Sequence, residues 1–415
     1  MNELLAEILR TMRPGRWLCA RLRGRTVTSL GESTVPAESD WAAGAAAPAI
    51  VGGVERQWWR WLLPFVIVAP MVGLGYGLGE RAFVFPEGAA LAVGVMVVGK
   101  QDWVRSGWRL LVLPTTCAVG GTALAYLPVP KVAGELLALG LAVALAQAVG
   151  GRLAPVVSAA VLPVVFGITT WVYPAAVAAI CLVLLVMVSL PGLRPEAPGV
   201  PVVGPQPRWP WSTLVLFSIV GAGWIVLASL VLRLAPVALA PPLLVAALEW
   251  CGQGARPLRI AVRRWVLLVV AAAVGGAASS VCPPMQIGLA ATQAVAASAV
   301  QMAAVAAVLV VMAWTGEYLY PALAIALVPN LIAPIVVWQY SLAIGVGAAA
   351  LFVGAFILAC TGRFCARRCV AMRSGCIRWR RAAVRGDRVG GHARGSATDA
   401  SQIRYLVIDA QTVWR

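Results

Sequence analysis

Few side chains inside the hydrophobic stretches of this sequence could do chemistry, and Glu87 is foremost among them. It lies between Pro86 and Gly88, about a turn inside the predicted outer end of an apolar segment. An ionisable residue inside such a span is a functional candidate by default, because burying its charge is costly. Glu87 could carry a coupling proton. The competing interpretation is that its side chain extends to an interface with water.

Two proline-containing segments supply a second kind of candidate, which is polar backbone. Pro155 and Pro163 stand eight residues apart in the first segment, and Pro321 and Pro329 stand eight apart in the second. A proline inside a helix removes an amide donor and frees a carbonyl. Within a membrane the freed carbonyls need partners in protein or water. We expect them to face a small solute; kinked, close-packed helices are the alternative.

The remaining polar residues in the spans divide into two groups. Ser158 and Asn330 belong to the expected solute path, and so does Pro242. Others are expected to have structural roles at interfaces with water or between helices: Glu80, Arg233, Glu249, Gln147, Gln293 and Gln301. The pairs Gly120-Gly121 and Gly275-Gly276 are expected to allow close helix packing rather than to touch a solute.

The sequence argues against enzymatic chemistry. Its one histidine, His392, lies in the C-terminal tail, and no phosphate-binding loop is present. Three tail cysteines, Cys365, Cys369 and Cys376, lack a fourth ligand at zinc spacing. We therefore expect no catalytic residues, no metal and no cofactor.

Composition places the chain among membrane proteins. Of its 415 residues, 61% are hydrophobic and only 12% are charged. Soluble domains carry about 25% charged residues, and runs of around twenty apolar residues recur here. We predict an all-α polytopic membrane protein. The net charge of +17 resides in tails and loops, so no nucleic-acid partner is expected.

The apolar runs predict twelve membrane helices in two six-helix repeats. The expected parts are a disordered segment 1–56, a first repeat 57–190, a Pro/Gly-rich linker 191–211, a second repeat 212–360 and an Arg-rich tail 361–415. The predicted spans are 62–79, 83–99, 110–127, 132–150, 153–168, 171–190, 212–232, 235–248, 261–280, 286–313, 318–334 and 340–360. Spans five and eleven are either crossing helices or re-entrant segments.

Matching motifs and charge support this plan. Trp171-Val-Tyr173 returns as Trp338-Gln-Tyr340, and Ala118-Val-Gly-Gly121 returns as Ala273-Val-Gly-Gly276. Basic residues favour the loops on one side of the membrane, which predicts an inner-membrane protein with both termini in the cytoplasm. The even number of spans in each half predicts parallel repeats. Basic tail residues are expected to contact anionic lipid headgroups: Arg363, Arg367, Arg368, Arg380 and Arg381.

The pattern resembles the HPP family of integral membrane proteins. The carrying residues are Pro86-Glu87-Gly88-Ala89-Ala90, the basic stretch from Arg105 to Gly121, and Leu153-Ala154-Pro155 with Ser158-Ala159-Ala160; Pro241-Pro242, Arg256-Pro257 and Tyr320-Pro321 repeat the plan. The resemblance implies a transporter. The family's His-Pro signature is absent from both copies, so its link to nitrite is not transferred. A rival resemblance is to FUSC-like aromatic-acid exporters, which have six-span halves and large cytoplasmic domains.

The expected function is secondary transport of a small solute, a small anion or organic acid, along a path between the repeats. The bilayer and this solute are the expected partners, and a homo-oligomer is left open. The alternative is a non-transporting membrane scaffold that acts through its basic tail.

Overall fold

The computed structural model describes residues 58–104, 107–190, 193, 208–231, 240–252, 258–283, 285–287, 289–332, 336–358 and 360. The chain divides into two units, Met1–Ala359 and Cys360–Arg415, and the description below concerns the first. Several expected features lie outside the described residues: the N-terminal segment 1–56, most of the linker 191–211, Arg233, and the tail with the five arginines expected to contact lipid.

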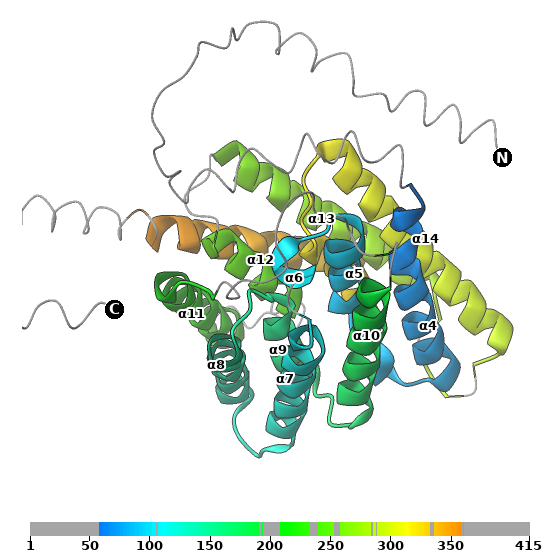
Figure 1. Cartoon of the computed structure of the whole chain (residues 1–415), viewed down its shortest axis with the longest axis horizontal. Helices are drawn as coiled ribbons and strands as arrows, with labels where there is room; N and C mark the ends of the chain where they lie inside the picture. The colour runs from blue at the N-terminus through cyan, green and yellow to red at the C-terminus, as the bar shows by residue number, and fades with distance from the viewer. Residues whose placement is uncertain are drawn as a thin grey trace, which may run out of the picture. The chain divides into compact units, whose positions relative to one another are not determined.

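All regular elements in the described part of the chain are helices, as the sequence predicts (Figure 1). The first half contains α4 (Leu63–Leu78), α5 (Glu87–Ala92), α6 (Gln101–Val104), α7 (Arg109–Tyr126), α8 (Lys131–Val149), α9 (Pro155–Phe166) and α10 (Val172–Ser189). The second contains α11 (Trp211–Val226), α12 (Pro241–Gly252), α13 (Leu258–Val281), α14 (Ala291–Thr315), α15 (Pro321–Leu327) and a last helix, Val337–Leu358.

Seven helices are long and apolar enough to cross a membrane. They are Trp59–Leu78, Lys131–Val149, Val172–Ser189, Trp211–Leu230, Leu258–Val281, Ala291–Thr315 and Val337–Leu358. Large apolar side chains on their outer faces are exposed, for example Val66, Leu182 and Ile219. A soluble protein would bury such side chains, so the helices indicate a multi-pass membrane protein.

Each of the twelve predicted spans contains a helix, but five of these helices are not among the seven. α7 has 18 residues, whereas α5 has six, α9 and α12 have twelve each, and α15 has seven. A helix needs about 20 residues to cross the hydrocarbon core, and α5, α9, α12 and α15 fall well short of this. α7 is as long as α10, which is among the seven, but it is less apolar. The apolar runs are longer than these helices because prolines and glycines interrupt them. At Val93–Val97 the chain after α5 also widens into a π-helical turn.

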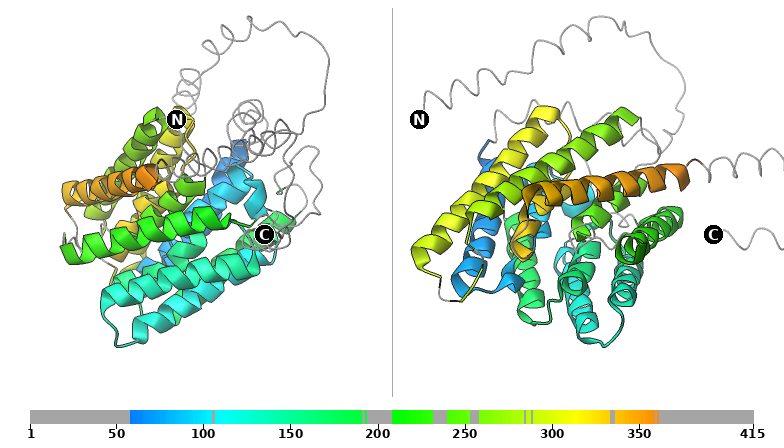
Figure 2. Two further views of the ribbon diagram at one scale, coloured as in Figure 1. Left: turned by 90° about the vertical axis from the view of Figure 1, so that its left-hand side faces the viewer. Right: turned by 180° about the vertical axis from the view of Figure 1, so that it is seen from behind.

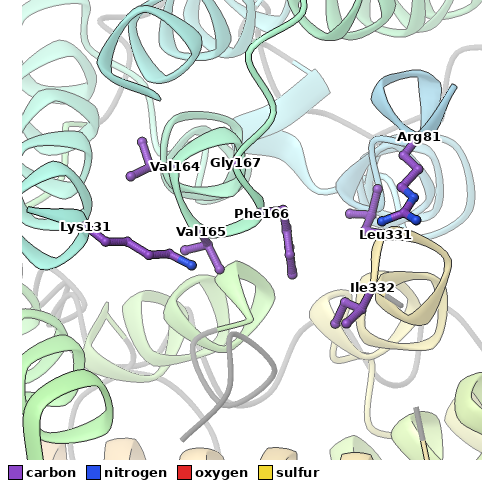
Figure 3. A pocket seen from close by; sticks show the side chains of 8 residues that line it. All are labelled: Arg81, Lys131, Val164, Val165, Phe166, Gly167, Leu331 and Ile332. Carbon is purple, nitrogen blue, oxygen red and sulfur yellow. The ribbon is translucent and has the colours of Figure 1, made fainter. Parts of the chain in front are cut away.

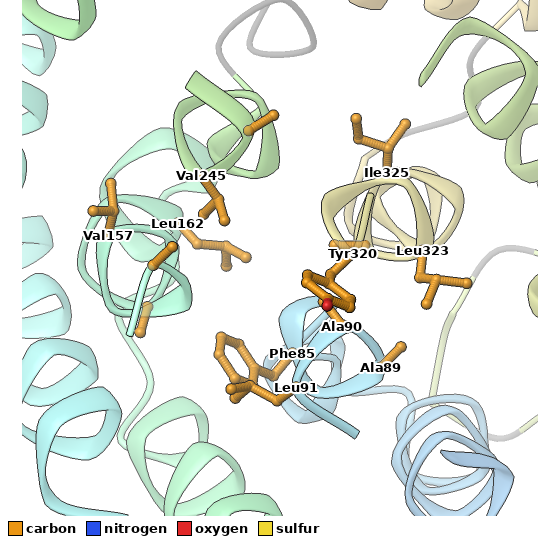
Figure 4. Packing of buried hydrophobic residues seen from close by; sticks show 14 of the residues in the cluster. Phe85, Ala89, Ala90, Leu91, Val157, Leu162, Val245, Tyr320, Leu323 and Ile325 are labelled. Atoms are coloured by element: carbon orange, nitrogen blue, oxygen red, sulfur yellow. The ribbon is translucent and has the colours of Figure 1, made fainter. Parts of the chain in front are cut away.

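The four short helices α5, α9, α12 and α15 form the centre of the unit. α5 packs on α9 and α15, and α12 packs on the same two helices, so the contacts close into a ring. α5 and α15 are buried along their whole length, and α9 and α12 are buried at every residue but the last. Figure 4 labels members of this core on all four helices. These helices are called the central helices below.

The long helices surround the central helices in matching pairs. α4 packs on α14 at one side of the unit, and α8 packs on α11 at the opposite side (Figures 1 and 2). α7 packs on α9 and α10, and α13 packs on α15. The indole of Trp265 in α13 donates a hydrogen bond of 2.7 Å to the Gly345 carbonyl of the last helix.

Glycines allow the closest of these approaches. A Cβ at Gly121 of α7 would collide with the carbonyl oxygen of Ala160, and a Cβ at Gly275 of α13 would collide with that of Ala326. The expectation that the glycine pairs serve packing is confirmed. The sequence match aligned Gly121 with Gly276, whereas the contacts relate Gly121 to Gly275, one residue away.

Candidate functional site

Glu87 lies in the middle of the unit, at the first residue of α5. Its side chain is fully buried, and within the described part of the chain neither carboxylate oxygen makes a hydrogen bond. The hydroxyl of Ser158 on α9 is close enough to act on the carboxylate, yet it too lacks a bond of regular geometry. Both groups thus lie in an apolar core without a hydrogen bond of regular geometry among the described residues, which is uncommon for buried polar groups.

Tyr173 explains the first proline segment. Pro163 has no amide to bond the carbonyl of Ala159, four residues earlier. The hydroxyl of Tyr173, at the start of α10, donates to that carbonyl at 3.3 Å. Its ring is buried and lies edge-on to Phe85. A tyrosine from the next helix thus replaces the hydrogen bond that the proline removes.

The second segment has the same arrangement. Pro329 frees the carbonyl of Ile325, and the hydroxyl of Tyr340 donates to it at 2.6 Å. The Trp-x-Tyr motif after each proline segment is therefore explained by its tyrosine, which satisfies a carbonyl in a place without water.

These contacts correct one expectation. The carbonyls freed by Pro163 and Pro329 do not face a solute, because tyrosines occupy them. Pro155 and Pro321 free none, since each is the first residue of its helix, where no amide bond is lost. The prolines start and kink helices, as in the alternative interpretation.

Asn330 joins the second proline segment to α4. Its side-chain oxygen accepts a hydrogen bond of 2.9 Å from the Tyr76 hydroxyl, and its amide donates to the Leu327 carbonyl at 3.0 Å. Gln301 of α14 is fully buried and donates to the Cys282 thiol at 3.8 Å. Gln301 thus bonds the residue that directly follows α13, and Asn330 bonds α4, so both side chains have partners within the protein.

A cluster of Lys100, Trp103, Glu249 and Tyr320 closes one end of the central helices. The Lys100 ammonium lies 2.7 Å from the Glu249 carboxylate, which is 4% exposed. The ammonium also lies 4.1 Å from the centre of the Trp103 ring, and that ring contacts Tyr320. Glu249 was expected to reach an interface with water, and this was wrong: it is buried in an ion pair. We call these residues the Lys100 cluster.

A pocket of about 340 Å³ lies at the opposite end of α9 and α15. Its lining residues are Arg81, Lys131, Val164, Val165, Phe166, Gly167, Leu331 and Ile332. In Figure 3, Lys131 and Arg81 approach from opposite sides, with Phe166 between them. The pocket combines apolar walls with two cations.

The ten predicted path residues are placed by the structure, but not around this pocket. All are buried in or beside the central helices: Pro86, Glu87, Gly88, Pro155, Ser158, Pro163, Pro242, Pro321, Pro329 and Asn330. Glu87 and Ser158 are brought together, whereas none of the ten lines the pocket. The interface between the halves is closely packed at these residues.

Sequence reasoning missed the two ends of the central helices. Basic residues in the loops were used only to predict topology, so Arg81, Lys131 and Lys100 were not singled out. Trp103 was not considered. One signal was available, because Lys100 and Lys131 are the only lysines in the chain. Each lies beside one end of the core. Among the described residues, no group of three His, Cys, Asp or Glu side chains could hold a metal ion.

The chain was compared with known proteins. No family model matches it, and no curated protein or solved structure matches it either. The HPP and FUSC-like resemblances therefore stay predictions.

Proposed function

We propose that the chain is a two-repeat secondary transporter for a small solute, a small anion or organic acid, and that Glu87 binds the coupling ion. The observation that carries the proposal is the buried, unpartnered Glu87 carboxylate. Burying an isolated charge costs several kcal/mol even after relaxation, so a stable protein keeps one mainly where it has a task. A proton bound at Glu87 and shared with Ser158 would supply the missing partner.

Matching contacts in the two halves support the repeats. Pro163, Ala159 and Tyr173 in the first half correspond to Pro329, Ile325 and Tyr340 in the second, with the same hydrogen bond in each. The helix pairs correspond as well: α4 contacts α5 and α14, while α11 contacts α12 and α8. Two parallel halves that share a central set of short helices suit a path between repeats.

The two ends of the central helices differ, which supports a conformation in which the solute path is closed at one end only. α9 and α15 both run from the Lys100 cluster to the pocket, so a path along them is shut at one end and open at the other. Under the positive-inside rule the closed end is cytoplasmic, because Arg259, Arg263 and Arg264 belong to the same end. Arg264 pairs there with Glu317 at 3.4 Å. The packed core is then the occluded part of an alternating-access cycle.

Electrical recording tests the proposal. Proteoliposomes on a solid-supported membrane would be challenged with jumps of nitrite, benzoate and benzenesulfonate. The proposal expects transient currents with at least one of these anions, and expects Glu87→Gln to abolish them. Glu80→Gln is the matched control, because Glu80 is partly exposed and only caps a short turn at the Ala82 amide.

The scaffold alternative makes the opposite prediction. If no anion gives a current above that of empty liposomes, and removal of residues 361–415 alone changes the behaviour of cells that carry the protein, the scaffold replaces the transporter.

A further inference from the structure

We propose that the pocket at the end of α9 and α15 binds a small monovalent organic anion with an apolar body. This inference deepens the proposed function, on which it rests for the role of the bound anion as a transported solute. The binding claim itself depends only on the pocket.

The position of the pocket favours a solute site. Val165 and Phe166 end α9, and Leu331 and Ile332 stand 166 residues further on, at the end of the segment that contains α15. The same spacing separates Pro163 from Pro329. Corresponding residues of the two halves therefore meet in the pocket, at the open end of the path.

Two cations supply the recognition of an anion. Arg81 is exposed, and Lys131 begins α8 on the other side of the pocket. The Glu80 carboxylate next to Arg81 is directed to the Ala82 amide, at 3.0 Å. The guanidinium of Arg81 can thus donate to a ligand in its planar, forked geometry.

One carboxylate limits the charge of the ligand. Glu135 lies one turn after Lys131 in α8, and the two charges interact. Glu135 is 1% exposed, and one of its oxygens accepts from Ser229, in the π-helical turn after α11, at 3.4 Å. Where this carboxyl is ionised, its charge offsets part of that of Lys131, so the pocket carries less than the two positive charges of Arg81 and Lys131. A monovalent anion is the better complement.

The walls select for an apolar body. Val164, Val165, Phe166, Leu331 and Ile332 are five of the eight lining residues. A volume of about 340 Å³ falls within the range of small-molecule sites. Phe166 can stack on a planar ring at little entropic cost. An inorganic anion would leave these walls unfilled, and a two-chain lipid would exceed the volume.

Calorimetric titration of the full chain in phosphatidylcholine nanodiscs tests the proposal, with benzenesulfonate as the probe. Benzenesulfonate should bind, whereas sulfate (no apolar body) and benzyl alcohol (no charge) should bind at least about tenfold more weakly. Arg81→Gln combined with Lys131→Gln should weaken binding by about tenfold or more. Arg259→Gln removes an exposed cation at the other end and should leave binding unchanged.

Three results would overturn the proposal. The first is wild-type affinity in the Arg81→Gln/Lys131→Gln variant, with a melting temperature that shows it is folded. The second is sulfate binding as tight as that of benzenesulfonate. The third is loss of binding when phosphatidylglycerol is added to the nanodisc, with that lipid retained in native mass spectra, because a lipid headgroup would then be the occupant.

The outcome is separable from that of the proposed function. Binding that requires Arg81 and Lys131, together with no current in any proteoliposome, would retain the pocket and remove the transporter. If the Arg81→Gln/Lys131→Gln variant has wild-type affinity and still gives currents, the transporter is retained and the anion site in the pocket is removed.

Discussion

The ammonium of Lys100 lies 2.7 Å from the carboxylate of Glu249, although 149 residues separate them in sequence. The ion pair joins the two halves of the chain at one end of the central helices. The Glu249 side chain is 4% exposed and the Lys100 side chain is 26% exposed, so only Lys100 remains accessible from outside the protein. Breaking such a pair leaves an uncompensated buried charge.

The first prediction concerns this pair. Lys100→Met should lower the free energy of unfolding by about 3 kcal/mol, because Glu249 loses its partner. Lys100→Met combined with Glu249→Met should recover most of the loss, since two apolar side chains need no partner. SDS titration of the protein in mixed micelles measures both, with Arg259→Met as the control. A double variant as unstable as the sum of the single variants would show that the ion pair is not formed.

The second prediction concerns the tyrosine that satisfies a proline-freed carbonyl. Tyr173→Phe should destabilise the protein by about 1–3 kcal/mol, because the Ala159 carbonyl is left unpaired in the core. In a Pro163→Ala background the same change should cost much less, since the restored amide can bond that carbonyl.

A double-mutant cycle in SDS titrations measures this coupling. Tyr126→Phe is the matched control, because Tyr126 is 54% exposed at the end of α7. Equal costs of Tyr173→Phe in the two backgrounds would contradict the assignment.

The third prediction concerns the glycine contacts. Gly121→Ala and Gly275→Ala should each destabilise the protein by about 1–3 kcal/mol, because the new methyl group meets a backbone carbonyl that cannot move aside. Gly140→Ala and Gly223→Ala are matched controls within helices, with open space around the new atom. They should be neutral or stabilising by about 0.5–1 kcal/mol. Thermal unfolding that ranks the four variants in any other order would refute the packing.

The fourth prediction separates stability from function at Ser158. Ser158→Ala removes a buried hydroxyl that has no partner, so the melting temperature should stay constant or rise. Anion-driven currents should fall, because this hydroxyl acts on the Glu87 carboxylate. Ser341→Ala, which removes a hydroxyl bonded to the Val337 carbonyl at 2.9 Å, should leave the currents unchanged. A large drop in stability with Ser158→Ala would indicate a structural hydroxyl instead.

The sequence predicted features that depend on local composition. Apolar runs gave the all-α membrane class, and the paired prolines marked the segments that became α9 and α15. Glu87 and Ser158 were both singled out, because a polar residue in an apolar run is visible without a structure.

What the sequence could not show are relations between distant residues. Nothing near Lys100 identifies Glu249 as its partner, and nothing near Pro163 shows that Tyr173 bonds the carbonyl of Ala159. Both depend on helix packing, which hydropathy does not encode. The number of membrane crossings is also a relation of this kind: seven helices are long and apolar enough to cross, and a buried short helix has the same apolar composition as a membrane-crossing one.

The most direct test of the account is proton movement through Glu87. Proteoliposomes loaded with the pH indicator pyranine would receive an inward gradient of benzenesulfonate, which cannot cross a bilayer as a neutral acid. The account predicts that the lumen acidifies with wild-type protein and does not acidify with Glu87→Gln, while Glu80→Gln behaves as wild type. Equal acidification with Glu87→Gln and wild type, or none above empty liposomes with wild type, would contradict it.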